Sequence, residues 1–103
     1  MITLQWASVG TLRENENYMV KVEDLTDSKV PALIGYVPDT KFIVPSTFRP
    51  KDNAAHVMSW TVVVVRQNGT DENGKTIWVP AGAVSVPRLF SWTGVAPANT
   101  PSP

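Results

Sequence analysis

Short runs in which apolar and polar residues alternate occupy most of this chain, and proline or glycine residues separate them. In the first run, Ile2, Leu4 and Trp6 alternate with Thr3 and Gln5. Period-two alternation places the two sets of side chains on opposite faces of a pleated strand. Helical spacing of apolar residues is nearly absent, and nine prolines and six glycines interrupt the 103 residues. The sequence therefore predicts an all-β fold.

Five further strands are predicted, at about residues 18–25, 32–37, 40–44, 57–67 and 88–93. The run 57–67 is the strongest, because it is rich in valines that are stiff at χ1 and favour sheet. Its apolar residues fall on both faces, which indicates a central strand covered on both sides for part of its length. Residues 75–79 are either the returning strand of a hairpin or a separate short ribbon, and the pattern leaves both open.

Irregular strand spacing and long loops favour a two-layer antiparallel β-sandwich over an up-and-down barrel. We expect the sandwich over residues 1–93 and an extended linker over 94–103, a stretch of Gly, Pro, Ala, Ser, Thr and Asn with a single Val. The expected core consists of the inward positions of the predicted strands: Leu4, Trp6, Tyr18, Val20, Val22, Phe42, Val44, Trp60, Val62, Val64, Phe90 and Trp92.

Charge and composition give no support to several classes of partner. Nine lysines and arginines balance nine aspartates and glutamates without a basic run, so neither nucleic acid nor an anionic membrane is an expected partner. Cysteine is absent, which excludes disulfides and thiolate zinc sites. No apolar run approaches the roughly 18 residues of a membrane span. The first residues lack a signal-peptide pattern, so we expect a cytoplasmic protein or a chain that starts downstream of a signal.

Residues that could carry chemistry are few. His56 is the single histidine, and a catalytic triad would have to recruit Ser59 and Asp52 around it. We interpret His56 as a solvated residue at the entry of the 57–67 strand. The Asp71–Gly74 stretch lacks the ligand spacing of a calcium loop and predicts a solvated hairpin tip. The sequence thus predicts no catalytic residue, no metal site and no cofactor.

The aromatic residues divide into two groups. Trp6, Trp60 and Trp92 are in phase with the inward faces of their strands, as core residues are. Trp78 lies near a proline turn and is expected to be half exposed. With Tyr36 it forms the candidate ligand surface, on which a saccharide ring could stack.

Four of the predicted strands resemble those of fibronectin type III domains. Residues 2–6 resemble the second strand, which ends in a core tryptophan, and residues 18–22 the third. Residues 60–66 resemble the sixth strand and Phe90-Ser91-Trp92 the seventh. More narrowly, these motifs are similar to immunoglobulin-like repeats of secreted bacterial multidomain proteins, which often sit beside LysM-type domains. The resemblance covers about residues 2–94, and the family's first strand, which would precede Ile2, is missing. If that strand was removed, residues 2–6 form an exposed edge strand.

The resemblance implies a non-catalytic structural or adhesive module of a larger secreted or cell-surface protein, in the extracellular space or the cell envelope. Its partners would be neighbouring domains of the same chain or other proteins, contacted through an open strand edge. The alternative is a module that binds carbohydrate or cell-wall polysaccharide through Trp78 and Tyr36.

Overall fold

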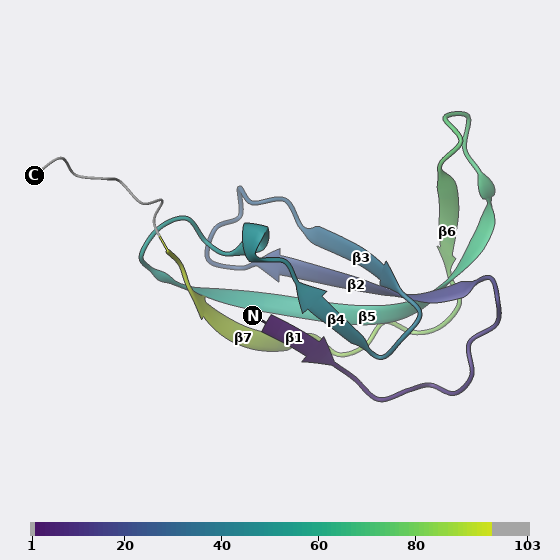
Figure 1. Cartoon of the computed structure of the whole chain (residues 1–103), viewed down its shortest axis with the longest axis horizontal. Helices are drawn as coiled ribbons and strands as arrows, with labels where there is room; N and C mark the ends of the chain where they lie inside the picture. The colour runs from purple at the N-terminus through teal and green to yellow at the C-terminus, as the bar shows by residue number, and fades with distance from the viewer. Residues whose placement is uncertain (1, 96–103) are drawn as a thin grey trace, which may run out of the picture.

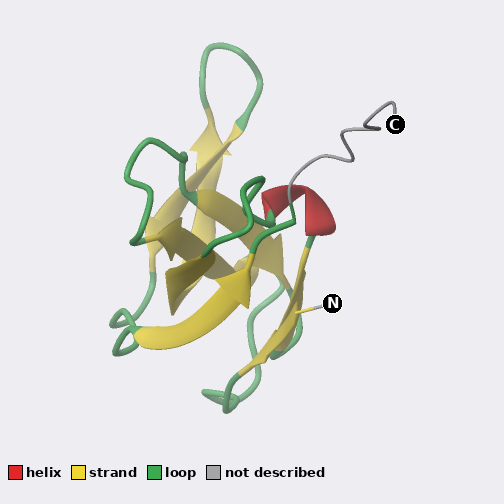
Figure 2. Cartoon of the chain, turned by 90° about the vertical axis from the view of Figure 1, so that its left-hand side faces the viewer, coloured by secondary structure: helices red, strands yellow, loops and turns green. Residues whose placement is uncertain are grey.

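Two antiparallel β-sheets make up the computed structural model, which describes residues 2–95 (Figures 1 and 2). Their strands are β1 (Ile2–Gln5), β2 (Glu16–Asp24), β3 (Leu33–Val37), β4 (Lys41–Val44), β5 (Ala55–Thr70), β6 (Thr76–Pro80) and β7 (Arg88–Thr93). A short 3₁₀ turn, η1 (Ser46–Phe48), follows β4. Within residues 2–95, no helix has the length and apolar character needed to cross a membrane. The predicted all-β fold is confirmed.

The smaller sheet consists of β1 and β4. The two strands pair antiparallel, with Ile2 opposite Val44 and Leu4 opposite Phe42. These four apolar residues share one face, because residues directly opposite each other in a ladder point to the same side. Leu4 and Val44 are buried, so this face is turned toward the core.

The larger sheet is organised around β5, which has 16 residues. One edge of β5 pairs with β2, and β2 in turn pairs with β3. The other edge of β5 pairs with β7 along its first half and with β6 along its second half. Residues 75–79 therefore belong mainly to the returning strand of a hairpin, the first of the two arrangements that the sequence left open. Figure 1 shows this hairpin rising away from the rest of the sheet.

The core lies between the two sheets. All twelve expected core residues are either buried in one cluster or packed against it. The cluster also contains Met58, which the sequence pattern did not assign although it is in phase with Trp60. Trp6 packs edge-on against Tyr18, with ring centroids 5.4 Å apart.

The outer face of the larger sheet is also partly covered. Val63 and Val65 point away from the core cluster, yet their exposed fractions are only 4% and 2%. This confirms that β5 is covered on both sides for part of its length. Tyr36, Met19 and Val63 follow one another across β3, β2 and β5, so they form one row on this outer face.

The chain leaves β7 in contact with the connection between η1 and β5. The Gly94 N–H donates a hydrogen bond to the Ala54 carbonyl (2.9 Å), and the Val95 N–H donates to the Pro50 carbonyl (3.0 Å). Of the expected linker 94–103, these first two residues are thus held by the sheet domain, and residues 96–103 lie outside the described residues.

Candidate functional site

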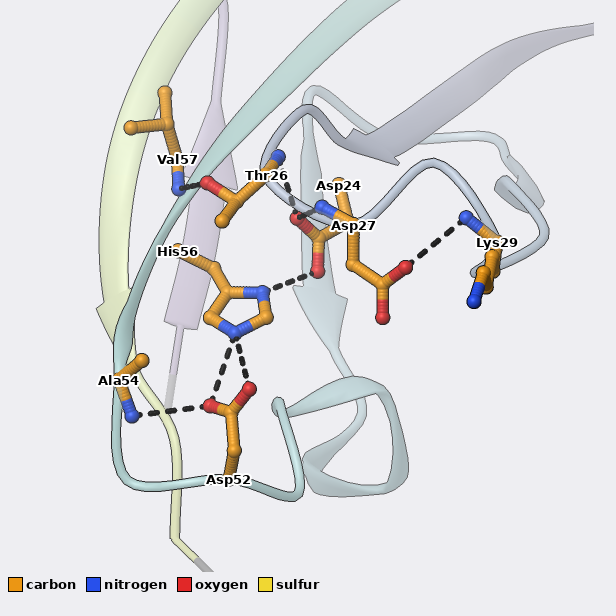
Figure 3. A network of polar contacts seen from close by, with 8 residues as sticks. All are labelled: Asp24, Thr26, Asp27, Lys29, Asp52, Ala54, His56 and Val57. Carbon is orange, nitrogen blue, oxygen red and sulfur yellow. Dashed lines mark hydrogen bonds and ion pairs between the residues drawn. The ribbon is translucent and has the colours of Figure 1, made fainter.

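A buried histidine between two carboxylates is the most concentrated polar feature of the described residues (Figure 3). His56 Nδ1 lies 2.7 Å from Asp24 Oδ2. On the other side of the ring, Nε2 lies 2.9 Å from both carboxylate oxygens of Asp52. The His56 side chain is only 5% exposed. The three residues come from β2, from β5 and from the crossover segment, which we define as residues 49–54.

Asp24 is held in place by the turn that follows β2. Its Oδ1 accepts hydrogen bonds from the N–H groups of Thr26 (2.9 Å) and Asp27 (3.0 Å). The Thr26 hydroxyl in turn accepts the Val57 N–H of β5 (2.9 Å). An aspartate that bonds the backbone two and three residues ahead is typical of such turns. With its side chain 2% exposed, Asp24 needs these donors, because a buried carboxylate without partners is costly.

Asp52 occupies a different environment, because its side chain is 59% exposed. Its Oδ1 accepts the Ala54 N–H (3.0 Å) and closes the turn that leads into β5. The same carboxylate therefore stabilises the turn within the crossover segment and links that segment to His56. Figure 3 shows the two aspartates approaching the imidazole ring from opposite sides.

The contacts shift two pKa values. The hydrogen bond to Asp24, followed by the one to Asp52, raises the pKa of His56 above its ordinary value of 6.5. The Ala54 N–H, followed by the His56 ring, lowers the pKa of Asp52 below its ordinary 3.8. Both shifts favour the charged pair of the His56 imidazolium and the Asp52 carboxylate.

The interpretation of His56 as a solvated residue is wrong. His56 belongs to β5 itself and points inward in phase with Met58, Trp60 and Val62. The alternation of Met58, Trp60 and Val62 includes position 56, so the burial of His56 was predictable from the sequence. Asp52 is a partner of His56, whereas Ser59 stands at an odd position on the opposite face of β5.

The arrangement is poorly suited to acid–base catalysis. A general base needs one imidazole nitrogen free to take a proton from substrate, and here both nitrogens face carboxylates. The carboxylates also lie on opposite sides of the ring rather than around one point. Among residues 2–95, no group of three or more potential ligands is arranged to hold a metal ion.

A cavity of about 420 Å³ adjoins this network. Its wall includes Phe48, Arg49, Lys51 and Asp27, together with the three network residues. Arg49 is already engaged, because its Nε donates to the Thr93 carbonyl (2.8 Å) at the end of β7. The cavity therefore combines charges of both signs with one aromatic wall.

The two residues of the candidate ligand surface lie together on the outer face of the larger sheet. The Tyr36 and Trp78 rings stack, with centroids 4.8 Å apart and an angle of 16° between their planes. Trp78 is half-buried and Tyr36 is 41% exposed. Their strands, β3 and β6, are not neighbours, so the sequence could group the two residues in one candidate surface but could not predict that their rings stack. The stacked pair is thus a partly exposed aromatic surface on this face of the sheet.

At the hairpin tip, Asp71 is used by the turn itself. Its Oδ1 accepts the N–H groups of Asn73 (2.8 Å) and Lys75 (3.0 Å), and Gly74 adopts a positive φ of 80°. The carboxylate thus caps an exposed turn, as expected of a hairpin tip.

Comparison of the chain with protein-family models, with curated proteins and with solved structures finds no match.

Proposed function

We propose that this chain is a non-catalytic structural or protein-interaction module of the immunoglobulin and fibronectin type III kind, working within a larger secreted or cell-surface protein. The strand order carries the proposal. In immunoglobulin-type sandwiches the second and fifth strands pair in one sheet, and the third, sixth and seventh lie side by side in the other. If β1 is the second strand, the pairing of β1 with β4 and the order β2–β5–β7 follow the same plan.

The polar groups support a structural role. The strongest polar cluster, around His56, has its hydrogen bonds satisfied within the fold and joins three segments of the chain. Along β1, the edge that does not pair with β4 is where the family's first strand would lie. Among residues 2–95 no strand pairs with this edge, and a preceding segment, a neighbouring domain or another protein would bind its backbone groups by strand addition.

Cross-linking mass spectrometry on the full-length gene product tests this proposal. Lys21 on β2, Lys41 on β4 and Lys75 at the hairpin report on three different surfaces. We expect cross-links from Lys41, which lies on β4 in the smaller sheet, to flanking segments or to another protein. A catalytic turnover by the folded chain that disappears in Asp52→Asn would overturn the non-catalytic assignment.

Carbohydrate or cell-wall binding is the second candidate, and the stacked Tyr36–Trp78 pair favours it. Two adjacent rings, one of them 41% exposed, offer the flat apolar surface on which saccharides stack. Pull-down with peptidoglycan and soluble polysaccharides tests this candidate. Retention that is lost in both Tyr36→Ala and Trp78→Ala, but kept in Val86→Ala at an exposed non-aromatic site, would support it. Equal retention of all three variants would eliminate it.

A further inference from the structure

The crossover segment is fastened on two sides. Toward β5, Asp52 contacts His56 at 2.9 Å. Toward β7, the carbonyls of Ala54 and Pro50 accept the N–H groups of Gly94 and Val95. The segment therefore connects the buried histidine to the point where the chain leaves the sheet.

The contact at Gly94 is backbone against backbone. A Cβ atom added to Gly94 would lie 2.8 Å from the Pro50 carbonyl oxygen and would collide with the carbonyl oxygen of Asp52. Gly94 is buried as a result. Any movement of residues 50–54 must therefore also disturb Gly94 and its hydrogen bond to Ala54.

The two carboxylates around His56 differ in their freedom to move. Asp24 is 2% exposed and holds two backbone N–H groups through Oδ1, whereas Asp52 is 59% exposed. A protonated imidazole donates one hydrogen bond to each carboxylate, but a neutral imidazole carries a single N–H. In the neutral state, one ring nitrogen would present a lone pair to carboxylate oxygens, which is repulsive.

We propose that His56 is a pH-sensitive latch, whose protonation holds the crossover segment and, through it, the Gly94–Val95 exit of the chain. On loss of the proton, the remaining N–H stays on Nδ1 and keeps its bond to buried Asp24. The Asp52 side chain then rotates toward solvent, and the Ala54 N–H loses its carboxylate acceptor. As a result, the hydrogen bonds that Gly94 and Val95 donate to Ala54 and Pro50 weaken.

Charges of both signs surround His56, and the carboxylates of Asp24 and Asp52 are the groups that hydrogen-bond to its ring. Asp27, Arg49 and Lys51 line the adjoining cavity, and from β7 the uncharged Trp92 faces His56. The hydrogen bonds to Asp24 and Asp52 raise the pKa of His56 above 6.5, so the latch is closed in mildly acidic solution. It opens as the pH rises through this raised value.

An NMR titration of the folded chain, combined with amide hydrogen exchange, tests the latch. We expect the amide signals of Ala54, Gly94 and Val95 to shift with the same midpoint as the His56 ring protons. Exchange protection of Gly94 and Val95, corrected for intrinsic rates, should fall about fivefold across that midpoint, the loss expected for roughly one hydrogen bond.

Two variants make the test specific. Asp52→Asn removes the exposed charge while keeping an oxygen that can accept the Ala54 N–H, and it should lower the His56 midpoint. Asp71→Asn makes the same change at the hairpin turn, where Asp71 also caps backbone N–H groups, and should leave the midpoint unchanged. The proposal would be overturned if the amide signals of Gly94 and Val95 did not change as His56 titrates. An Asp52→Asn variant with an unchanged His56 midpoint would also overturn it.

Discussion

At the scale of single residues, Gly35 is a position of close contact between the two sheets. A Cβ atom added there would lie 2.8 Å from Cζ of Phe42 and within collision distance of a neighbouring ring carbon. The Phe42 ring, from β4, thus packs on the bare backbone of β3. Glycine is required here by close approach rather than by an unusual φ angle.

We therefore expect Gly35→Ala to lower the free energy of unfolding by about 1–3 kcal/mol, because the added methyl overpacks the contact. Urea unfolding measures the loss. Gly82→Ala is the matched control, since a Cβ at Gly82 meets nothing within 4 Å and its φ is not in the left-handed region. Equal stabilities of the two variants would show that the Phe42 ring moves aside without cost.

His56 and Tyr36 show what residue-level reasoning could and could not predict. Inward phase with Met58 and Trp60 was sufficient to predict that His56 is buried. Its bond to Asp24, 32 positions away, could not be predicted, because nothing local in the sequence marks that aspartate as its partner. The stacking of Tyr36 on Trp78 was inaccessible for the same reason.

At the scale of elements, the strands were predictable and their partners were not. Alternation located all the strands to within a few residues, since each pattern is local. Pairing depends on contacts between distant segments, such as Val20 with Val62 in β2 and β5. Strand β6 illustrates the limit: Thr76, Ile77 and Pro80 are exposed and Trp78 and Val79 only half-buried, so no clear apolar face assigned this strand to a neighbour.

The segment between β6 and β7 behaves as a further part of the sheet edge. The Ala81 N–H donates to the Val64 carbonyl, and the Ser85 N–H donates to the Val62 carbonyl, each at 2.8 Å. The Ser85 hydroxyl accepts the Val62 N–H, also at 2.8 Å. Residues 81–87 thus supply hydrogen-bond partners to the backbone of β5 between its pairings with β6 and β7.

We expect Ser85→Ala to destabilise the fold by about 0.5–1.5 kcal/mol, because the part-buried Val62 N–H loses its acceptor. Thermal or urea unfolding measures the effect, and hydrogen exchange at Val62 should increase in parallel. Ser91→Ala removes a serine hydroxyl at an exposed position of β7 and is the control variant for this loss of stability. A Ser85→Ala variant as stable as Ser91→Ala would mean that water replaces the hydroxyl.

At the scale of the whole molecule, stability should depend on pH in both directions. The raised pKa of His56 contributes stability that is complete below 6.5 and is lost as the pH rises through the folded-state value. The lowered pKa of Asp52 contributes stability that is complete above 3.8 and is lost as the pH falls through its folded-state value. Both contributions are complete between these limits.

We therefore expect the free energy of unfolding, measured with urea across this range, to be highest in mildly acidic solution and to decline toward alkaline pH. Asp52→Asn should weaken both the acid-side and the alkaline-side dependence. A stability that increases steadily through neutral into alkaline pH would contradict the assignment of His56 as a charged, stabilising group.

The position of β5 in the chain also has a consequence for synthesis on the ribosome. This strand pairs with β2, β6 and β7, yet it begins only at Ala55, after β2 and β3 in the chain. Before it emerges, β2 has β3 alone as a partner and leaves its other edge unpaired. Such edges expose a nascent chain to aggregation. The larger sheet can close only when residues 55–93 have left the exit tunnel, because β5, β6 and β7 all follow β2 and β3 in the chain.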